Sequence, residues 1–183
     1  MTSEIVSRIW EGRIPVRIGL SARDSQQGLA PSVFYCGTLR RNGYIHVVLP
    51  LLLRFFAPFV EDSSALKRDD WWLEFEDVPV KWNWPIGVSF DVMTGFDPSN
   101  AEPEPQAWEL TLHHKDYPAE YIVPILTPPP SVRNQFLEDY WINQMKEACF
   151  ILTGSAKPIM NLSRANSANF WKSVENRKFP RDH

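Results

Sequence analysis

Several side chains of this sequence have types and spacings that could carry chemistry. Glu74 and Glu76 stand two residues apart in an alternating segment, so they would share one face of a strand. Paired carboxylates can hydrolyse glycosidic bonds, but no second carboxylate cluster accompanies them, and a solvated strand face is the better interpretation. His113 and His114 are adjacent in a predicted strand and would point to opposite faces, so they cannot chelate one metal ion together.

The two cysteines, Cys36 and Cys149, cannot form a disulfide framework, and neither has a second Cys or His at a zinc-ligand spacing. Cys149 also lacks an upstream His and Asn that would make it a nucleophile, so it is interpreted as a core residue. The sequence contains no Walker, Rossmann or GxSxG pattern. We therefore predict no catalytic residues, no metal site and no cofactor, in a reducing, intracellular setting.

The charge of the 183 residues is distributed unevenly. Residues 1–153 carry 13 Lys and Arg against 20 Asp and Glu, whereas residues 154–183 carry 6 against 2. The basic end favours contact with an anionic membrane surface or an acidic partner, and a solvated helical surface is the alternative. The candidate membrane contacts are Lys157, Arg164, Lys172, Arg177 and Lys178.

The N-terminus lacks the apolar core of a secretory signal. The longest apolar run, residues 47–60, is interrupted by Pro50, Arg54 and Pro58 and is shorter than the roughly 20 residues of a membrane-spanning helix. The sequence therefore predicts a soluble protein.

Hydrophobic periodicity predicts the elements that must position these side chains. We expect an N-terminal helix within residues 1–12, and Pro50 to lie in the first turn of the main helix. The predicted strands are residues 16–20, 33–39, 71–76, 78–82 and 108–114, with the main helix at 44–59 and a short helix after Pro85. This order is that of a ubiquitin-like beta-grasp domain, over residues 13–118.

A proline-rich linker is predicted at residues 119–130, followed by a helix-rich domain at 131–183. Ser131 would cap a helix that ends near Leu152 before Gly154, and Ser167 would cap a second helix that ends at Asn176. The fold class is therefore α+β, a beta-grasp domain followed by a small helical domain. Most of the eight tryptophans are interpreted as core residues, but Trp84 and Trp10 could line a partner groove.

Several motifs are spread over nearly the whole chain: Trp10-Glu11-Gly12-Arg13-Ile14-Pro15-Val16, Tyr44-Ile45 at the start of the main helix, Trp72-Leu73-Glu74-Phe75-Glu76, Pro79-Val80-Lys81-Trp82-Asn83-Trp84-Pro85-Ile86-Gly87, Phe90-Asp91, Trp108 to His114, Met145-Lys146-Glu147-Ala148 and Asn169-Phe170-Trp171. In this order they resemble the motifs of the autophagy protein 5 family. Family members continue with a second ubiquitin-like domain, so the helix-rich domain is expected to be incomplete, in a fragment or a shortened form.

The resemblance implies a subunit of the autophagy conjugation system and marks Lys146 as the acceptor of the ubiquitin-like modifier autophagy protein 12. It further implies activation by the E1-like autophagy protein 7, transfer by the E2-like autophagy protein 10 and assembly with the coiled-coil autophagy protein 16. The conjugate would act like an E3 in the lipidation of autophagy protein 8. It implies a cytoplasmic protein recruited peripherally to the pre-autophagosomal membrane, with no nucleic-acid partner.

The helix itself indicates how Lys146 is presented. The residues Leu137, Trp141, Met145, Ala148, Cys149 and Leu152 gather on one stripe, and Lys146 points roughly 130 degrees away from its centre. Its amine should therefore reach solvent beside Asn143, Asp139 and Phe150. A free lysine amine is almost entirely protonated at neutral pH, so the conjugating enzyme must supply the activation. The alternative is an unmodified ubiquitin-like module that binds a partner helix.

Overall fold

The computed structural model describes residues 4, 11–24, 33–60, 70–97, 107–123 and 135–176, with side chains from 137 to 174 in the last range. The chain divides into two compact units, Met1–Pro124 and Ile125–His183. Of the predicted N-terminal helix, only residues 4, 11 and 12 are described, and Trp10 lies outside the described residues.

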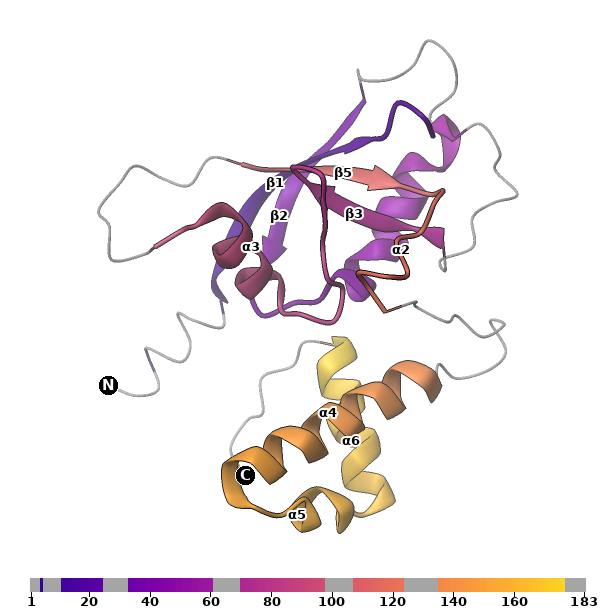
Figure 1. The fold of residues 1–183 in the computed structure, drawn as a ribbon. Coiled ribbons are helices and arrows are strands. Elements are labelled where there is room, and N and C mark those ends of the chain that lie inside the picture. The colour runs from indigo at the N-terminus through magenta and orange to yellow at the C-terminus, as the bar shows by residue number, and fades with distance from the viewer. Residues whose placement is uncertain are drawn as a thin grey trace. The chain divides into compact units, whose positions relative to one another are not determined.

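The first unit is a five-stranded mixed sheet crossed by one long helix (Figure 1). Its elements are β1 (Arg13–Leu20), β2 (Phe34–Arg40), α2 (Ile45–Phe56), the 3-10 turn η1 (Ala57–Phe59), β3 (Trp72–Phe75), β4 (Val78–Pro79), α3 (Ile86–Thr94) and β5 (Trp108–His113). The strand order is β2-β1-β5-β3-β4. The predicted beta-grasp order of strands and helices is thus confirmed.

The pairing of β1 defines the centre of the sheet. β1 runs antiparallel to β2 and parallel to β5, with Ile18 opposite Tyr35 on one side and Leu110 on the other. Alternate β1 side chains are buried because successive residues of a strand face opposite sides. Together with the buried face of α2 they form the core, which contains Ile14, Val16, Ile18, Leu49, Leu52 and Phe56.

The prediction that Pro50 lies in the first turn of its helix is wrong. Pro50 is the sixth residue of α2, inside the helix. The ring removes one backbone donor, yet the helix continues because Leu49, Leu52 and Phe56 bury their side chains on its inner face. Packing outweighs the lost hydrogen bond here.

The beginning of the predicted linker is held against the first unit. Ile122 is buried, and the Val123 carbonyl accepts hydrogen bonds from Trp82 Nε1 and, at 2.8 Å, from Tyr117 Oη. Residues 124–130 of the predicted linker lie outside the described residues.

The second unit contains three helices, α4 (Gln135–Thr153), α5 (Lys157–Met160) and α6 (Arg164–Asn176), among the residues that the structure describes. The predicted cap at Ser167 is wrong, because α6 begins three residues earlier. Ser163 precedes α6, and its Oγ accepts a hydrogen bond of 3.2 Å from the Asn166 amide, as an N-cap does. The sequence pattern did not predict α5. The predicted cap residue Ser131 lies outside the described residues.

Candidate functional site

Lys146 lies in α4, whose C-terminal end is defined by short-range hydrogen bonds. Thr153 Oγ1 donates to the Cys149 carbonyl at 2.8 Å, and the Gly154 amide donates to the Phe150 carbonyl at 2.8 Å. Gly154 has a φ of 74°, the left-handed conformation that commonly ends a helix. The predicted terminator at Gly154 is confirmed, and it places Lys146 two turns before the end of α4.

The Lys146 side chain is half-buried, and its amine lies at the surface of the second unit. Nζ donates a hydrogen bond of 3.2 Å to Asn143 Oδ1, one turn earlier on the same helix. This contact agrees with the expected position beside Asn143. A single neutral amide acceptor in an exposed position holds the amine weakly, since such a bond exchanges for one with water at little net cost.

The expected buried stripe of α4 is only partly correct. Leu137 is buried, and Trp141, Met145 and Cys149 are half-buried. Ala148 is exposed and Leu152 is 82% exposed, so both predictions of burial are wrong. Periodicity identifies a face of a helix but does not reveal over how many turns a neighbouring element covers that face.

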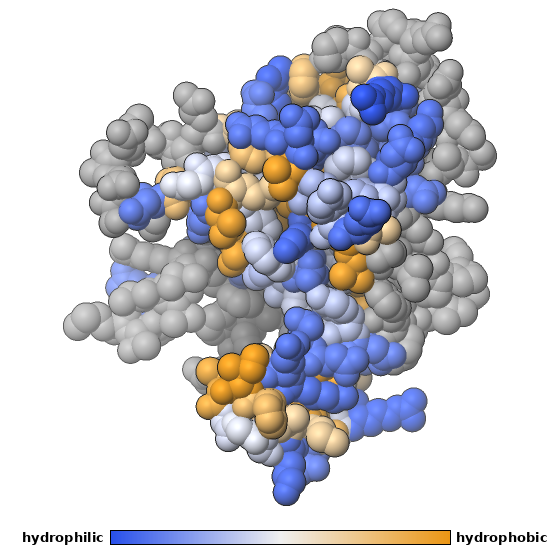
Figure 2. Space-filling model, viewed as in Figure 1, coloured by the Kyte–Doolittle hydropathy of each residue, from blue (hydrophilic) through white to orange (hydrophobic). Residues whose placement is uncertain are grey.

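The end of α4 and the adjoining α5 instead expose large apolar side chains. Phe150, Ile151, Leu152 and Met160 are each at least 60% exposed. Figure 2 shows hydrophobic surface gathered on one side of the helical unit. This unit thus presents an apolar surface at the opposite end of α4 from the buried Leu137.

The structure describes the side chains of three of the five candidate membrane contacts. Lys157, Arg164 and Lys172 are exposed on α5 and α6. Arg177 and Lys178 lie outside the described residues. No helix in the described ranges has the length and apolar character needed to cross a bilayer.

Trp84, the other candidate for a partner groove, is half-buried beside Lys81, whose Nζ lies 4.5 Å from the centroid of the indole ring. Its role in a partner groove stays a prediction. The core interpretation is confirmed for Trp71, Trp82, Trp108 and Trp171, each at most 2% exposed.

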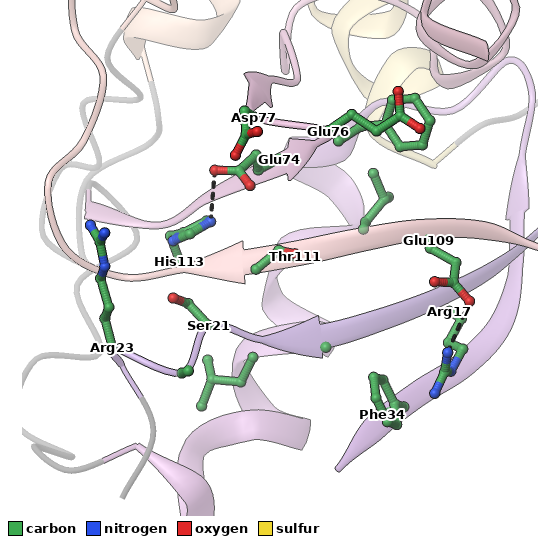
Figure 3. Close-up of a pocket in the computed structure, with 15 residues that line it drawn as sticks. Arg17, Ser21, Arg23, Phe34, Glu74, Glu76, Asp77, Glu109, Thr111 and His113 are labelled. Carbon is green, nitrogen blue, oxygen red and sulfur yellow. Dashed lines mark hydrogen bonds and ion pairs between the residues drawn. The ribbon is translucent and has the colours of Figure 1, made fainter. Parts of the chain in front are cut away.

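A hollow of about 690 Å³ on the first unit is a feature that the sequence did not reveal (Figure 3). It is lined by the outward-facing side chains of β1, β3 and β5, including Arg17, Glu74, Glu109 and His113. Its lining contains two ion pairs between neighbouring strands, Arg17 with Glu109 at 2.9 Å and His113 with Glu74 at 3.2 Å. These residues are adjacent in space through strand pairing, which no local motif encodes.

His113 is held between two carboxylates and an aromatic ring. Its Nε2 lies 3.2 Å from Glu74 Oε2, its Nδ1 lies 3.7 Å from Asp24 Oδ2, and its ring stacks on Trp72 at 4.1 Å. Burial lowers the pKa of His113 from its ordinary value of 6.5 and outweighs Glu74 and Asp24, which act in the opposite direction. The interpretation of a solvated strand face is therefore wrong for Glu74, which is half-buried and pairs with His113, whereas Glu76 is exposed and lies in the turn after β3.

His114 lies on the other side of the strand, where it is buried and packs 5.2 Å from the ring of Trp71. The predicted opposite orientation of the two histidines is confirmed. No set of three or more His, Cys, Asp and Glu side chains in the described ranges is arranged to hold a metal ion.

Comparisons with known proteins identify both units. The model of the UblA domain of autophagy protein ATG5 matches residues 9–114, and that of the alpha-helical bundle region of ATG5 matches residues 134–181. Autophagy protein 5 of Pichia angusta is 46% identical over 173 residues, covering 94% of this chain and 58% of that protein. The Candida albicans protein of the same name is 35% identical over 184 residues, covering 96% and 62%.

A solved structure agrees with this match. The crystal structure of Kluyveromyces marxianus Atg5 superposes with a TM-score of 0.75 at 32% identity, covering 96% of this chain and 64% of that one. The chain thus spans about three fifths of the length of the relatives that it matches. The ubiquitin-like sheet, the helical unit and these matches together show that the chain belongs to the autophagy protein 5 family.

Proposed function

We propose that this protein is a subunit of the autophagy conjugation system and accepts autophagy protein 12 through an isopeptide bond to Lys146. The observation that supports the proposal most directly is the position of the Lys146 amine at the surface of α4, where its one hydrogen bond to a described residue, Asn143, measures 3.2 Å. An acceptor amine must reach a thioester held by another protein and must lose its proton there. Within the described part of the second unit, the weak contact with Asn143 is the hydrogen bond that has to be released for that approach.

The protein would act as a scaffold without catalytic residues of its own. Autophagy protein 7 would activate the modifier and autophagy protein 10 would transfer it, so that deprotonation of Lys146 takes place in the active site of the transferring enzyme. The conjugate would assemble with autophagy protein 16 and, like an E3, promote lipidation of autophagy protein 8. Under this proposal the protein would be cytoplasmic and would be recruited peripherally to the pre-autophagosomal membrane.

The substitution Lys146→Arg tests the proposal because arginine keeps the positive charge but lacks a nucleophilic primary amine. With the purified modifier, autophagy proteins 7 and 10 and ATP, we expect the conjugate to disappear, as measured by intact mass. Lys157→Arg, an exposed lysine of the same unit, is the matched control and should give the wild-type yield. A Lys146→Arg protein that is conjugated at the wild-type yield would contradict the proposal.

The alternative function is that of an unmodified ubiquitin-like module that binds a partner helix. The exposed apolar residues Phe150, Ile151 and Leu152 favour this alternative, since exposed apolar patches often mark protein interfaces. The same assay separates the two functions. Under the alternative, no Lys146-dependent increase in mass appears even with the complete set of enzymes.

A further inference from the structure

A second hollow, of about 450 Å³, lies in the first unit between β3, α3 and β5. Four aromatic side chains line it: Phe75, Phe90, Phe96 and Trp108. Phe90 and Trp108 are buried and meet edge to face at 5.6 Å, whereas Phe75 and Phe96 are half-buried. We call this feature the aromatic hollow. Its buried rings form a rigid base, and its half-buried rings offer accessible faces.

The charges around the aromatic hollow are negative. Glu76 and Glu109 belong to its lining, and its described lining residues include no Lys, Arg or His. Glu109 already contacts Arg17 at 2.9 Å. Glu76 is exposed and has no ion pair within the ranges that the structure describes, so its charge is available to a ligand. Aromatic faces beside a carboxylate attract a cation rather than an anion.

The protein itself shows that these rings accept a guanidinium group. The Arg41 guanidinium carbon lies 5.9 Å from the centroid of Phe90 and 5.9 Å from that of Phe96, and Asp91 pairs with Arg41. Arg41 is not part of the lining of the aromatic hollow. The arrangement of a guanidinium over aromatic rings with a carboxylate alongside thus already exists at its edge.

The aromatic hollow also adjoins the larger hollow of Figure 3, because both are lined by Phe75, Glu76 and Glu109. Beyond this shared boundary the larger hollow adds the carboxylates of Glu74 and Asp77, together with Arg23 and with Arg17, which pairs with Glu109. Trp108 and Glu109 face opposite sides of β5, so a ligand that places one side chain among the aromatic rings would continue past the shared Glu76 to reach the larger hollow. That continuity fits a peptide better than a small free cation.

Trp108 supplies one further polar group. It is 2% exposed, and its indole N–H has no acceptor in the described part of the chain. The ligand does not contact this enclosed group, but its NMR signal reports on binding at the adjoining rings.

From these observations we propose that the aromatic hollow binds an arginine side chain carried by an extended basic segment of a partner protein. The planar guanidinium would stack on Phe75 or Phe96 and pair with Glu76, and the flanking peptide would cross the larger hollow. Arginine fits better than lysine because its planar, weakly hydrated head stacks on aromatic faces. The inference is independent of the proposed conjugation, since it uses only residues of the first unit.

The test is a titration of the isotope-labelled full chain, followed by NMR, with a five-residue peptide that carries one central arginine between alanine and glycine residues. We expect shifts at the Trp108 indole and at the amides of Phe75 and Phe96. The same peptide with citrulline, which is neutral and nearly identical in shape, should bind about threefold more weakly or worse. A norleucine peptide tests an apolar occupant and should bind no better than the citrulline peptide.

The matched variants are Glu76→Gln and Glu120→Gln, which change exposed carboxylates of the same unit inside and outside the aromatic hollow. Glu76→Gln should weaken arginine binding about threefold, and Glu120→Gln should leave it unchanged. Unchanged spectra of the free variants will show that both remain folded.

Three results would overturn the inference: no shift at Trp108, Phe75 or Phe96, equal binding of the arginine and citrulline peptides, or tighter binding of the norleucine peptide. Lys146→Arg should bind the arginine peptide like the wild type. Failure of conjugation and failure of peptide binding are therefore distinguishable.

Discussion

At the scale of single residues, Gly87 is fixed by a close backbone contact. It lies at the start of α3, and its amide donates to the Arg41 carbonyl at 2.7 Å. A Cβ atom at this position would lie 3.0 Å from that carbonyl oxygen and 2.9 Å from Arg41 Cβ. Both distances are shorter than side chains ordinarily allow, so only glycine fits where α3 approaches the end of β2.

We expect Gly87→Ala to destabilise the first unit by about 1–3 kcal/mol, the usual cost of overpacking. Urea denaturation followed by tryptophan fluorescence measures the effect as a lower midpoint. Val88→Ala, at the next position, is the control, since Val88 is 45% exposed and should change the midpoint little. Equal midpoints for Gly87→Ala and the wild type would contradict the contact.

His113 gives the protein a pH-dependent stability. Its pKa is lower in the folded chain than the ordinary 6.5 because it is buried, so the unfolded chain takes up the proton more readily. The stabilising contribution is fully present above pH 6.5 and is lost as the pH falls from 6.5 through the folded pKa. Glu74, Asp24 and Arg23 are the charged groups that act on the ring.

The prediction is that the wild type loses thermal stability more steeply than His113→Gln as the pH is lowered from about 8 to about 5.5. Melting temperatures from circular dichroism at several pH values measure the two slopes. The other histidines are common to both proteins, so they cancel in the difference. Parallel slopes would show that the ring titrates alike in the folded and unfolded states.

At the scale of elements, the two-residue turn between β3 and β4 is locally strained. Phe75 pairs with Val78, and the intervening Glu76 and Asp77 have φ angles of 48° and 64°. Turns with positive φ at both central residues favour Asn-Gly or Asp-Gly. A Glu-Asp pair at these positions is unfavourable, and the turn keeps its geometry because the paired strands on either side determine it.

Replacing Asp77 by glycine should therefore stabilise the first unit by about 0.5–1 kcal/mol, because glycine adopts a positive φ without steric cost. Asp77→Ala is the control at the same position, since alanine removes the carboxylate without tolerating this φ. The midpoint of urea denaturation should rise for Asp77→Gly and not for Asp77→Ala. An equal rise for both variants would show that the effect comes from loss of the Asp77 charge and not from the φ angle.

Sequence patterns predicted the elements of the sheet better than those of the helical unit. Alternation in β1 and β3 reflects burial on one face of a sheet, so the order of strands and helices along the chain and the core tryptophans followed from local sequence. The order of the strands within the sheet did not. Pro50 was misplaced because local rules do not include the packing of α2. Ser163 caps α6 in place of the predicted Ser167, and local sequence does not separate them because both are serines at the start of a weakly amphipathic segment.

In the candidate site, too, features within one element were predictable from the sequence, and contacts between distant segments were not. The surface position of the Lys146 amine and its contact with Asn143 followed from helical geometry within one element. The hollows did not, because Glu74, His113 and Asp24 meet only through the pairing of β3 with β5 and the return of the chain after β1. Such contacts between distant segments have no local signature.

At the scale of the whole molecule, charge is divided between the units. Residues 1–124 carry 11 Lys and Arg against 17 Asp and Glu, whereas residues 125–183 carry 8 against 5, and Lys157 and Lys172 are exposed on the helical unit. We propose that these helices contact anionic membranes, where each basic side chain contributes about 1 kcal/mol near the surface.

The double substitution Lys157→Glu and Lys172→Glu should abolish flotation of the protein with vesicles that contain phosphatidylserine. With neutral phosphatidylcholine vesicles, little of either the wild type or the doubly substituted protein should float. Lys115→Glu, an exposed lysine of the first unit, is the control and should float like the wild type. If the doubly substituted protein floated with phosphatidylserine vesicles as the wild type does, Lys157 and Lys172 would have no role in membrane contact.

The parallel pairing of β1 with β5 has a consequence for how the chain is made. Residues paired between these strands, such as Val16 and Trp108, are separated by most of the first unit. On a ribosome, the hairpin of β1 and β2 emerges early, but the inner edge of β1 has no partner until β5 leaves the exit tunnel. Contacts so distant in sequence slow folding, and an unpaired edge invites aggregation. The nascent protein is thus prone to aggregate until β5 has left the exit tunnel and can pair with β1.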